Sequence, residues 1–202
     1  TAVGYTALGA VNAANNNTAI GDSCLKLNTS GANNTGLGQA ALDQNTTGGN
    51  NTALGRGALE LNTSGGENTA VGKGALSTGT TTQSYNTAVG TGALAGRQSS
   101  GNTALGYNAG TATGTGGEAT LIGYLSGDAI TGGNYNTGVG YQSIGQVTTG
   151  DANTGIGRGG LEGVTTGSNN TSIGYSSGKS LTTGSNNSFL GKDAGITGSP
   201  GG

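Results

Sequence analysis

Two carboxylates, Asp43 and Glu60, come nearest in this chain to a type and spacing that could do catalytic chemistry. Their residue numbers differ by 17, which is also the period of a repeat that runs through the sequence. If each repeat forms one coil, the two residues stand in adjacent coils, about 4.8 Å apart at Cα. Retaining glycosidases place two carboxyl groups roughly 5 Å apart. When the repeats are aligned, Lys26 holds the position of Asp43 and Glu60 in the preceding repeat. We therefore favour a solvated surface ridge, with Lys26 as the counter-charge, and predict no catalytic residue.

The composition gives little support to other catalytic or metal-binding chemistry. The 202 residues contain no histidine, and the nine acidic residues do not share one column as calcium ligands would. The Gly-Gly-x-Gly-x-Asp repeat of calcium-binding rolls is absent. The one cysteine, Cys24, occupies a column that otherwise holds Ala, Ser or Gly, which favours a small buried residue over a reactive thiol. We therefore expect a protein that is not an enzyme and holds no metal or cofactor.

Charge and hydropathy argue against two classes of partner. Seven basic and nine acidic residues give a net charge of −2, and no basic stripe is present to neutralise phosphates. No apolar run approaches the ~20 residues that a membrane span needs. We therefore expect neither nucleic-acid binding nor membrane insertion.

The period itself predicts the fold. The repeat glycines recur with a spacing of 17 in residue number, except for one spacing of 18 that is followed by one of 16. A fixed period over a whole chain is typical of a solenoid. We predict a single domain, 1–202, and interpret it as a fragment of a longer chain because it begins inside a repeat. The twelve repeat glycines are Gly4, Gly21, Gly38, Gly55, Gly72, Gly90, Gly106, Gly123, Gly140, Gly157, Gly174 and Gly191.

Within each repeat we predict an all-β coil with two short strands. One strand covers the Thr-Ala-aliphatic segment before the glycine, and the other lies around Ala58 and Leu59. The aliphatic residue, such as Leu54, is expected to point into the rod, and the small residue before it, such as Ala53, to point outward. The outward small column leaves room for a close partner, and we predict a homotrimer with this column, or the adjoining Ala-Leu strand, at the subunit contact. Asparagines that recur once per coil, such as Asn51, are expected to form an amide ladder. Twelve coils give a narrow parallel β-roll roughly 58 Å long.

The candidate surface-binding residues are four tyrosines. Tyr107, Tyr124 and Tyr141 follow three consecutive repeat glycines, and Tyr85 ends the irregular turn 80–85 of the one longer coil. Exposed aromatic rings stack against sugar rings, and irregular turns carry binding more often than a regular scaffold does. The alternative is that the tyrosine column only packs along the rod.

The segment Asn51–Leu59, followed by Asn62–Gly65, resembles the Asn-Thr-Ala-x-Gly repeats of phage-type tail fibres and tail-fibre-domain proteins. It is similar, more loosely, to the repeats of trimeric autotransporter adhesin heads. The resemblance extends over essentially the whole chain. It implies a parallel homotrimer of left-handed β-rolls, extracellular or on a virion surface, that serves attachment to a cell-surface glycan or receptor.

Three functions stay open at this level. A structural fibre segment or adhesin shaft is the preferred hypothesis. The first alternative is the protomer of an extracellular filament that stacks end to end through open coil edges. The second is an ice-binding β-solenoid, because many ice-binding proteins present regularly spaced threonines on a β-roll.

Overall fold

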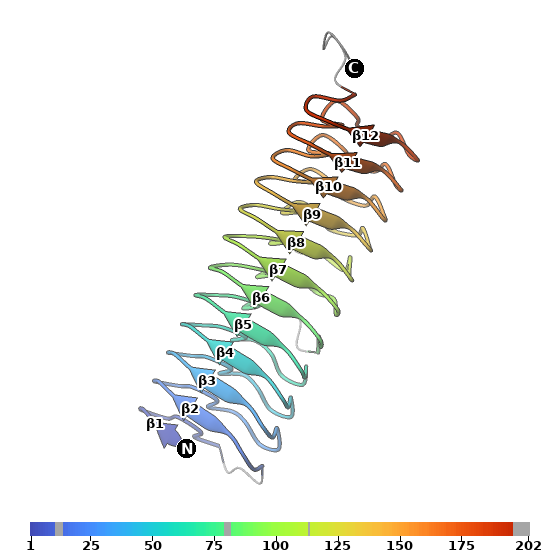
Figure 1. Cartoon of the computed structure of the whole chain (residues 1–202). Helices are drawn as coiled ribbons and strands as arrows, with labels where there is room; N and C mark the ends of the chain where they lie inside the picture. The colour runs from blue at the N-terminus through green and yellow to red at the C-terminus, as the bar shows by residue number, and fades with distance from the viewer. Residues whose placement is uncertain (11–13, 79–81, 113, 196–202) are drawn as a thin grey trace.

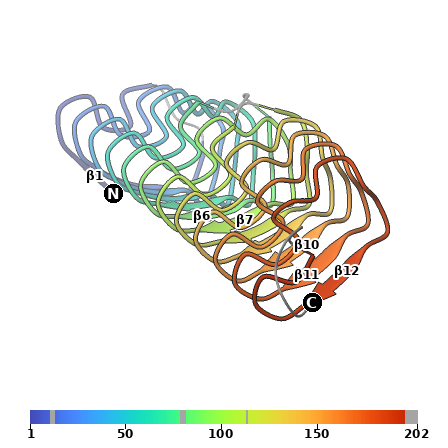
Figure 2. The same cartoon turned by 90° about the horizontal axis from the view of Figure 1, so that it is seen from above.

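The computed structural model describes residues 1–10, 14–78, 82–112 and 114–195. These residues form a β-solenoid in which each coil contributes one short strand, and the strands lie one above another along the rod (Figure 1). Seen from above, the strands lie together on one side of the coils (Figure 2). The all-β solenoid predicted from the period is therefore confirmed.

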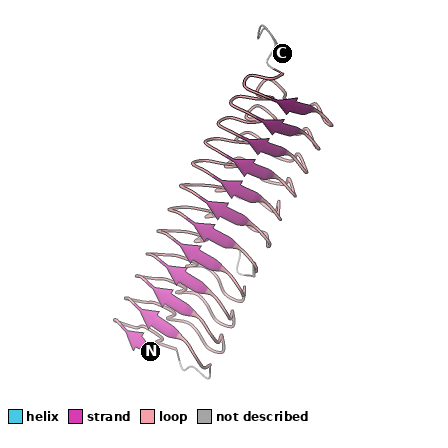
Figure 3. Cartoon of the chain, in the orientation of Figure 1, coloured by secondary structure: helices cyan, strands magenta, loops and turns pink. Residues whose placement is uncertain are grey.

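One parallel sheet of twelve strands runs through the described residues, and each strand pairs with the next strand along the chain. Apart from one isolated bridge between Arg97 and Gly114, the described residues between the strands form turns and loops (Figure 3). Among the described residues there is no helix with the length and hydropathy of a membrane span. The strands are β1 (Ala2–Val3), β2 (Thr18–Ile20), β3 (Thr35–Leu37), β4 (Thr52–Leu54), β5 (Thr69–Val71), β6 (Thr87–Val89), β7 (Thr103–Leu105), β8 (Thr120–Ile122), β9 (Thr137–Val139), β10 (Thr154–Ile156), β11 (Thr171–Ile173) and β12 (Ser188–Leu190).

The strand register survives the one irregular pair of coils. Thr69 pairs with Thr87 across the longer coil, and Thr87 pairs with Thr103 across the shorter coil that follows. The extra residue is therefore absorbed outside the strands. The turn 80–85, predicted to be irregular, lies partly outside the described residues, which omit 79–81.

The prediction of which strand residue faces inward is wrong. Ala53, at the centre of β4, is 1% exposed, whereas Leu54 is 42% exposed. Where a turn leucine such as Leu59 already fills the coil, only a small side chain fits behind the strand. The same inversion holds in β2 to β11, whose central residues are buried and whose last residues are exposed or half-buried. The small column is therefore covered by its own chain and is not available for the subunit contact that was expected there.

The second strand, expected around Ala58 and Leu59, is replaced by tight turns. Leu59 has a left-handed backbone with φ 53°. The Ala58 N–H donates to the Gly55 carbonyl at 3.2 Å, and the Asn62 N–H donates to the Leu59 carbonyl at 3.1 Å. A left-handed backbone costs a non-glycine residue about 1–2 kcal/mol, which burial of a leucine side chain offsets with about 1.5–3 kcal/mol. Burial of the leucine side chain in the core therefore stabilises the turn.

The predicted asparagine ladder is confirmed, and the interior holds a second one. In the first ladder the Asn51 N–H donates to Asn34 Oδ1 at 3.0 Å, and Asn51 Nδ2 donates to the Gly65 carbonyl at 2.9 Å. In the second ladder Asn45 Nδ2 donates to Asn28 Oδ1 at 2.8 Å. Each buried amide thereby finds partners in its own coil and in a neighbouring coil, which joins the coils where apolar contacts are few.

The interior changes along the rod by exchange of volume between two positions of a coil. Where the strand centre is Leu121, the turn position is Gly127, and a Cβ there would lie 2.5 Å from Leu121 Cδ2. Where the turn carries Ile144, the strand centre is Gly138, and its Cβ would lie 2.7 Å from Ile144 Cγ1. Large and small residues therefore alternate so that the narrow interior stays filled without overlap.

Candidate functional site

The outward side of the sheet carries two continuous columns of residues. Because side chains alternate across a strand, a buried strand centre leaves the residues on either side of it facing solvent. One column is aliphatic, with every member exposed or half-buried: Val3, Ile20, Leu37, Leu54, Val71, Val89, Leu105, Ile122, Val139, Ile156, Ile173 and Leu190. The other column is hydroxylic: Thr18, Thr35, Thr52, Thr69, Thr87, Thr103, Thr120, Thr137, Thr154, Thr171 and Ser188. We call these two columns together the Thr-aliphatic face.

The glycine after each strand sets one edge of this face. Gly55 has φ 134°, and a Cβ at this position would lie 2.6 Å from the carbonyl oxygen of Gly72 in the next coil. Only glycine fits such a close approach of two backbones with a positive φ. The chain therefore turns away from the sheet directly after the aliphatic residue, in the same way in coil after coil.

The aliphatic column leaves unburied apolar surface along the whole sheet. Full burial of such a side chain is worth about 1.5–3 kcal/mol, so roughly 1 kcal/mol per residue remains to be gained from the exposed part. Contiguous apolar patches of this kind mark interaction surfaces in soluble proteins. The face is also uncharged, so another surface could cover it without burying an unpaired charge.

A column of tyrosines stands next to the face, one residue beyond the glycines. The rings of Tyr107 and Tyr124 are 5.2 Å apart with an angle of 14° between them, and those of Tyr124 and Tyr141 are 5.3 Å apart at 4°. Arg158 continues the column, with its guanidinium carbon 5.4 Å from the ring centroids of both Tyr141 and Tyr175. The column is thus an aromatic stack that becomes a cation–π stack.

The structure brings three of the four candidate tyrosines together. Tyr107, Tyr124 and Tyr141 stack on one another, so that both faces of the Tyr124 ring are covered and its edge is left to solvent. Tyr85 belongs to a different column, since it directly precedes a ladder asparagine, and it is 67% exposed. Sugar binding by these residues stays a prediction, and the stack restricts it to ring edges and hydroxyl groups.

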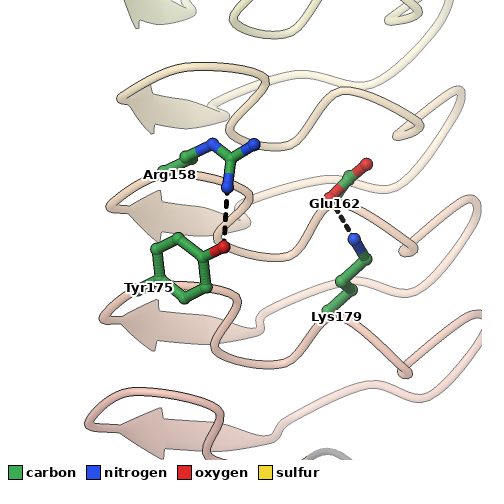
Figure 4. A network of polar contacts seen from close by, with 4 residues as sticks. All are labelled: Arg158, Glu162, Tyr175 and Lys179. Carbon is green, nitrogen blue, oxygen red and sulfur yellow. Dashed lines mark hydrogen bonds and ion pairs between the residues drawn. The ribbon is translucent and has the colours of Figure 1, made fainter.

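Sequence reasoning did not select Arg158 and Tyr175, which complete the column. Arg158 Nη1 donates a hydrogen bond of 2.6 Å to the Tyr175 hydroxyl (Figure 4). Both residues occupy the position after a repeat glycine, so the column alignment contained the signal. The sequence does not specify that the guanidinium stacks between the two rings.

A small pocket opens beside this end of the column. Its volume is about 90 Å³. Glu162 and Lys179 form an ion pair of 3.0 Å on one side of it (Figure 4). The pocket is lined by Tyr141, Gln142, Arg158, Gly159, Glu162, Tyr175, Ser176 and Lys179.

The remaining residues considered for chemistry have structural surroundings. Cys24 is fully buried, and burial raises the pKa of its thiol to about 11, which leaves it protonated and unreactive at neutral pH. Asp43 accepts a 2.6 Å hydrogen bond from Gln44 Nε2. The described residues contain no group of three or more His, Cys, Asp or Glu that could hold a metal ion.

Comparison with known proteins returns no match to a family model, to a curated protein or to a solved structure. The geometry of the Thr-aliphatic face and of the tyrosine column is therefore the basis for a functional assignment.

Proposed function

We propose that this chain is a segment of a structural fibre or adhesin shaft on a virion or cell surface, and that it acts as a parallel homotrimer. The observation that carries the proposal is the aliphatic column, which runs without a polar residue from β1 to β12. The resemblance of the repeats to those of tail fibres supports the trimer. The function requires no catalytic residue, because a shaft works by length and stiffness.

The Thr-aliphatic face is the surface through which the protomers pack. A symmetric bundle of parallel rods needs an apolar stripe that keeps its position from coil to coil, and strand register keeps this one in place. Threonines beside the stripe donate and accept hydrogen bonds at the rim of the contact. The sum over the column exceeds what a single coil gains, so length strengthens association.

Sedimentation velocity of the purified chain tests the assembly. The proposal expects a discrete species of three times 19.1 kDa over a wide range of concentration. A monomer would contradict the trimer. Species of indefinite length, seen as continuous fibrils in negative-stain images, would favour the filament protomer instead.

Ice binding is the second candidate, and the outward threonine column favours it. The threonines of β2 to β11 recur at the strand spacing, about 4.8 Å, on the same side of one sheet. A trimer that buries the Thr-aliphatic face would hide them, so the two functions exclude each other in one assembly. An ice-recrystallisation assay separates them: inhibition by a monomer, lost in Thr103→Lys, would support ice binding over the shaft.

A further inference from the structure

We infer that the pocket at Arg158 binds the carboxylate of an acidic saccharide, such as a uronic-acid residue of a linear glycan. The inference rests on the proposed role as a fibre or adhesin segment for its biological meaning, while the geometry of the pocket is independent of how the protomers assemble.

Arg158 is held in place before any ligand arrives. Its guanidinium lies over the rings of Tyr141 and Tyr175, 5.4 Å from each centroid, and Nη1 is fixed by the Tyr175 hydroxyl at 2.6 Å. A stacked guanidinium still presents N–H groups along its edge, in the fork geometry that matches a carboxylate. Because this side chain is already ordered, binding loses less side-chain entropy than it would with a free arginine.

The charge around the pocket is left unbalanced in favour of an anion. Glu162 is paired with Lys179 at 3.0 Å, and Asp193 with Lys192 at 3.7 Å. Among the described residues no carboxylate lies within ion-pair distance of Arg158, whose charged group interacts only with aromatic rings and a hydroxyl. One unpaired positive charge therefore faces a pocket that also has a lysine at its rim.

The size and lining of the pocket favour a sugar over a peptide. A volume of about 90 Å³ admits a carboxylate and part of one ring. Gln142, Ser176 and the Tyr175 hydroxyl line it, and such groups suit the hydroxyls of a sugar, whereas the pocket offers no apolar recess for a peptide side chain. Tyr124 and Tyr107 then extend a row of phenol edges away from Arg158, along which an extended glycan can continue.

The first half of the rod provides a matched control. Arg56 occupies the same column as Arg158, and with Glu60 and Lys73 it lines a pocket of about 320 Å³. The column neighbours of Arg56 are Gln39 and Lys73 rather than tyrosines, so its guanidinium has no aromatic clamp. If charge alone bound acidic sugars, the two arginines would be equivalent.

Isothermal titration calorimetry of the full chain tests the inference with matched ligands and variants. We expect a hyaluronan hexasaccharide to bind wild type at least tenfold more tightly than a neutral cellohexaose or an acidic Glu-rich hexapeptide. Arg158→Gln should weaken hexasaccharide binding at least tenfold, Arg158→Lys should restore only part of it, and Arg56→Gln should leave it unchanged. Thermal melts confirm that each variant is folded.

Three results would overturn the inference: no binding of the hexasaccharide to wild type, equal binding of the peptide, or equal losses in Arg158→Gln and Arg56→Gln. Failure of this experiment is distinguishable from failure of the shaft proposal, because the latter is decided by the mass of the assembly. A trimer that binds no acidic sugar would be a shaft without this site.

Discussion

The coils before and after the middle of the rod have the same backbone conformation, but different side chains fill their interiors. In the first part the turn leucines, such as Leu42, fill the interior beside the buried ladder of Asn28, Asn45 and Asn62. In the second part the asparagine positions become Ile130, Val147 and Val164, all fully buried, and several turn leucines become glycine. The outward aliphatic column and the strand-end glycines run through both parts. The comparison teaches that the backbone plan and the face are fixed by the fold, whereas the interior needs only the right volume.

Substitution of the glycine that follows a strand should destabilise the fold equally in both parts of the rod. Gly55→Ala and Gly157→Ala would place a Cβ 2.6 Å and 2.5 Å from the carbonyl oxygen of the next coil, at a φ that disfavours any side chain. We expect each to lower the free energy of unfolding by about 3–5 kcal/mol, measured by chemical denaturation.

Gly191→Ala is the control for that prediction. Gly191 has φ 111°, but no described atom lies within 4 Å of its ideal Cβ position, so only backbone strain applies. We expect a loss of about 1 kcal/mol. Equal losses at all three glycines would show that close approach of the coils is not what selects glycine.

Within one coil, exchanging the large residue at the strand centre and the small residue in the turn should preserve stability. Gly127→Leu alone overlaps Leu121 and should destabilise by about 2–3 kcal/mol, although leucine adopts the same left-handed backbone at the equivalent Leu59. Adding Leu121→Ala restores the small strand centre and the large turn residue of the first part of the rod and should recover most of the loss, while Ile130, whose Cδ1 lies 3.0 Å from the ideal Cβ position of Gly127, is unchanged. Additive effects in this double-mutant cycle would contradict the volume account.

Arg97 stands at the seam between the two interiors and is fully buried. Its Nη1 donates to the carbonyls of Gly116 and Ile130, but Nε and Nη2 have no partner in the described structure. A buried charge without a counter-charge is costly, so Arg97→Gln, which keeps a donor and removes the charge, should raise the free energy of unfolding by about 1 kcal/mol at pH 7. A loss of stability would show that the cation is needed at the seam.

The pH dependence of Arg97 gives an independent check. Burial lowers the pKa of the Arg97 guanidinium from its ordinary, higher value to about 10 in the folded chain. The unfolded chain therefore binds more protons between these values, and the contribution of Arg97 to stability rises with pH in this range. Wild type should gain stability relative to Arg97→Gln as the pH increases through 10 in urea denaturation. A constant difference would contradict the shifted pKa.

The sequence was sufficient for the solenoid, its period and the asparagine ladder, because a strict period places equal residues above one another. It was not sufficient to tell inside from outside. Both Ala53 and Leu54 fit a strand, and the usual rule that the larger apolar residue is buried fails here because the turn leucine Leu59 already fills the interior of the coil. The tyrosine column was visible as an alignment, but the clamp around Arg158 depends on ring orientation, which the residue types do not specify.

A matched pair of leucines tests most directly whether the Thr-aliphatic face is the surface of self-association. Leu54 lies on the face and Leu61 lies off it in a turn, and both are 42% exposed. By sedimentation velocity we expect Leu54→Lys to shift the trimer toward folded monomer, because three lysines would meet at the contact, while Leu61→Lys stays trimeric. Dissociation by Leu61→Lys, or an unchanged trimer with Leu54→Lys, would contradict the account.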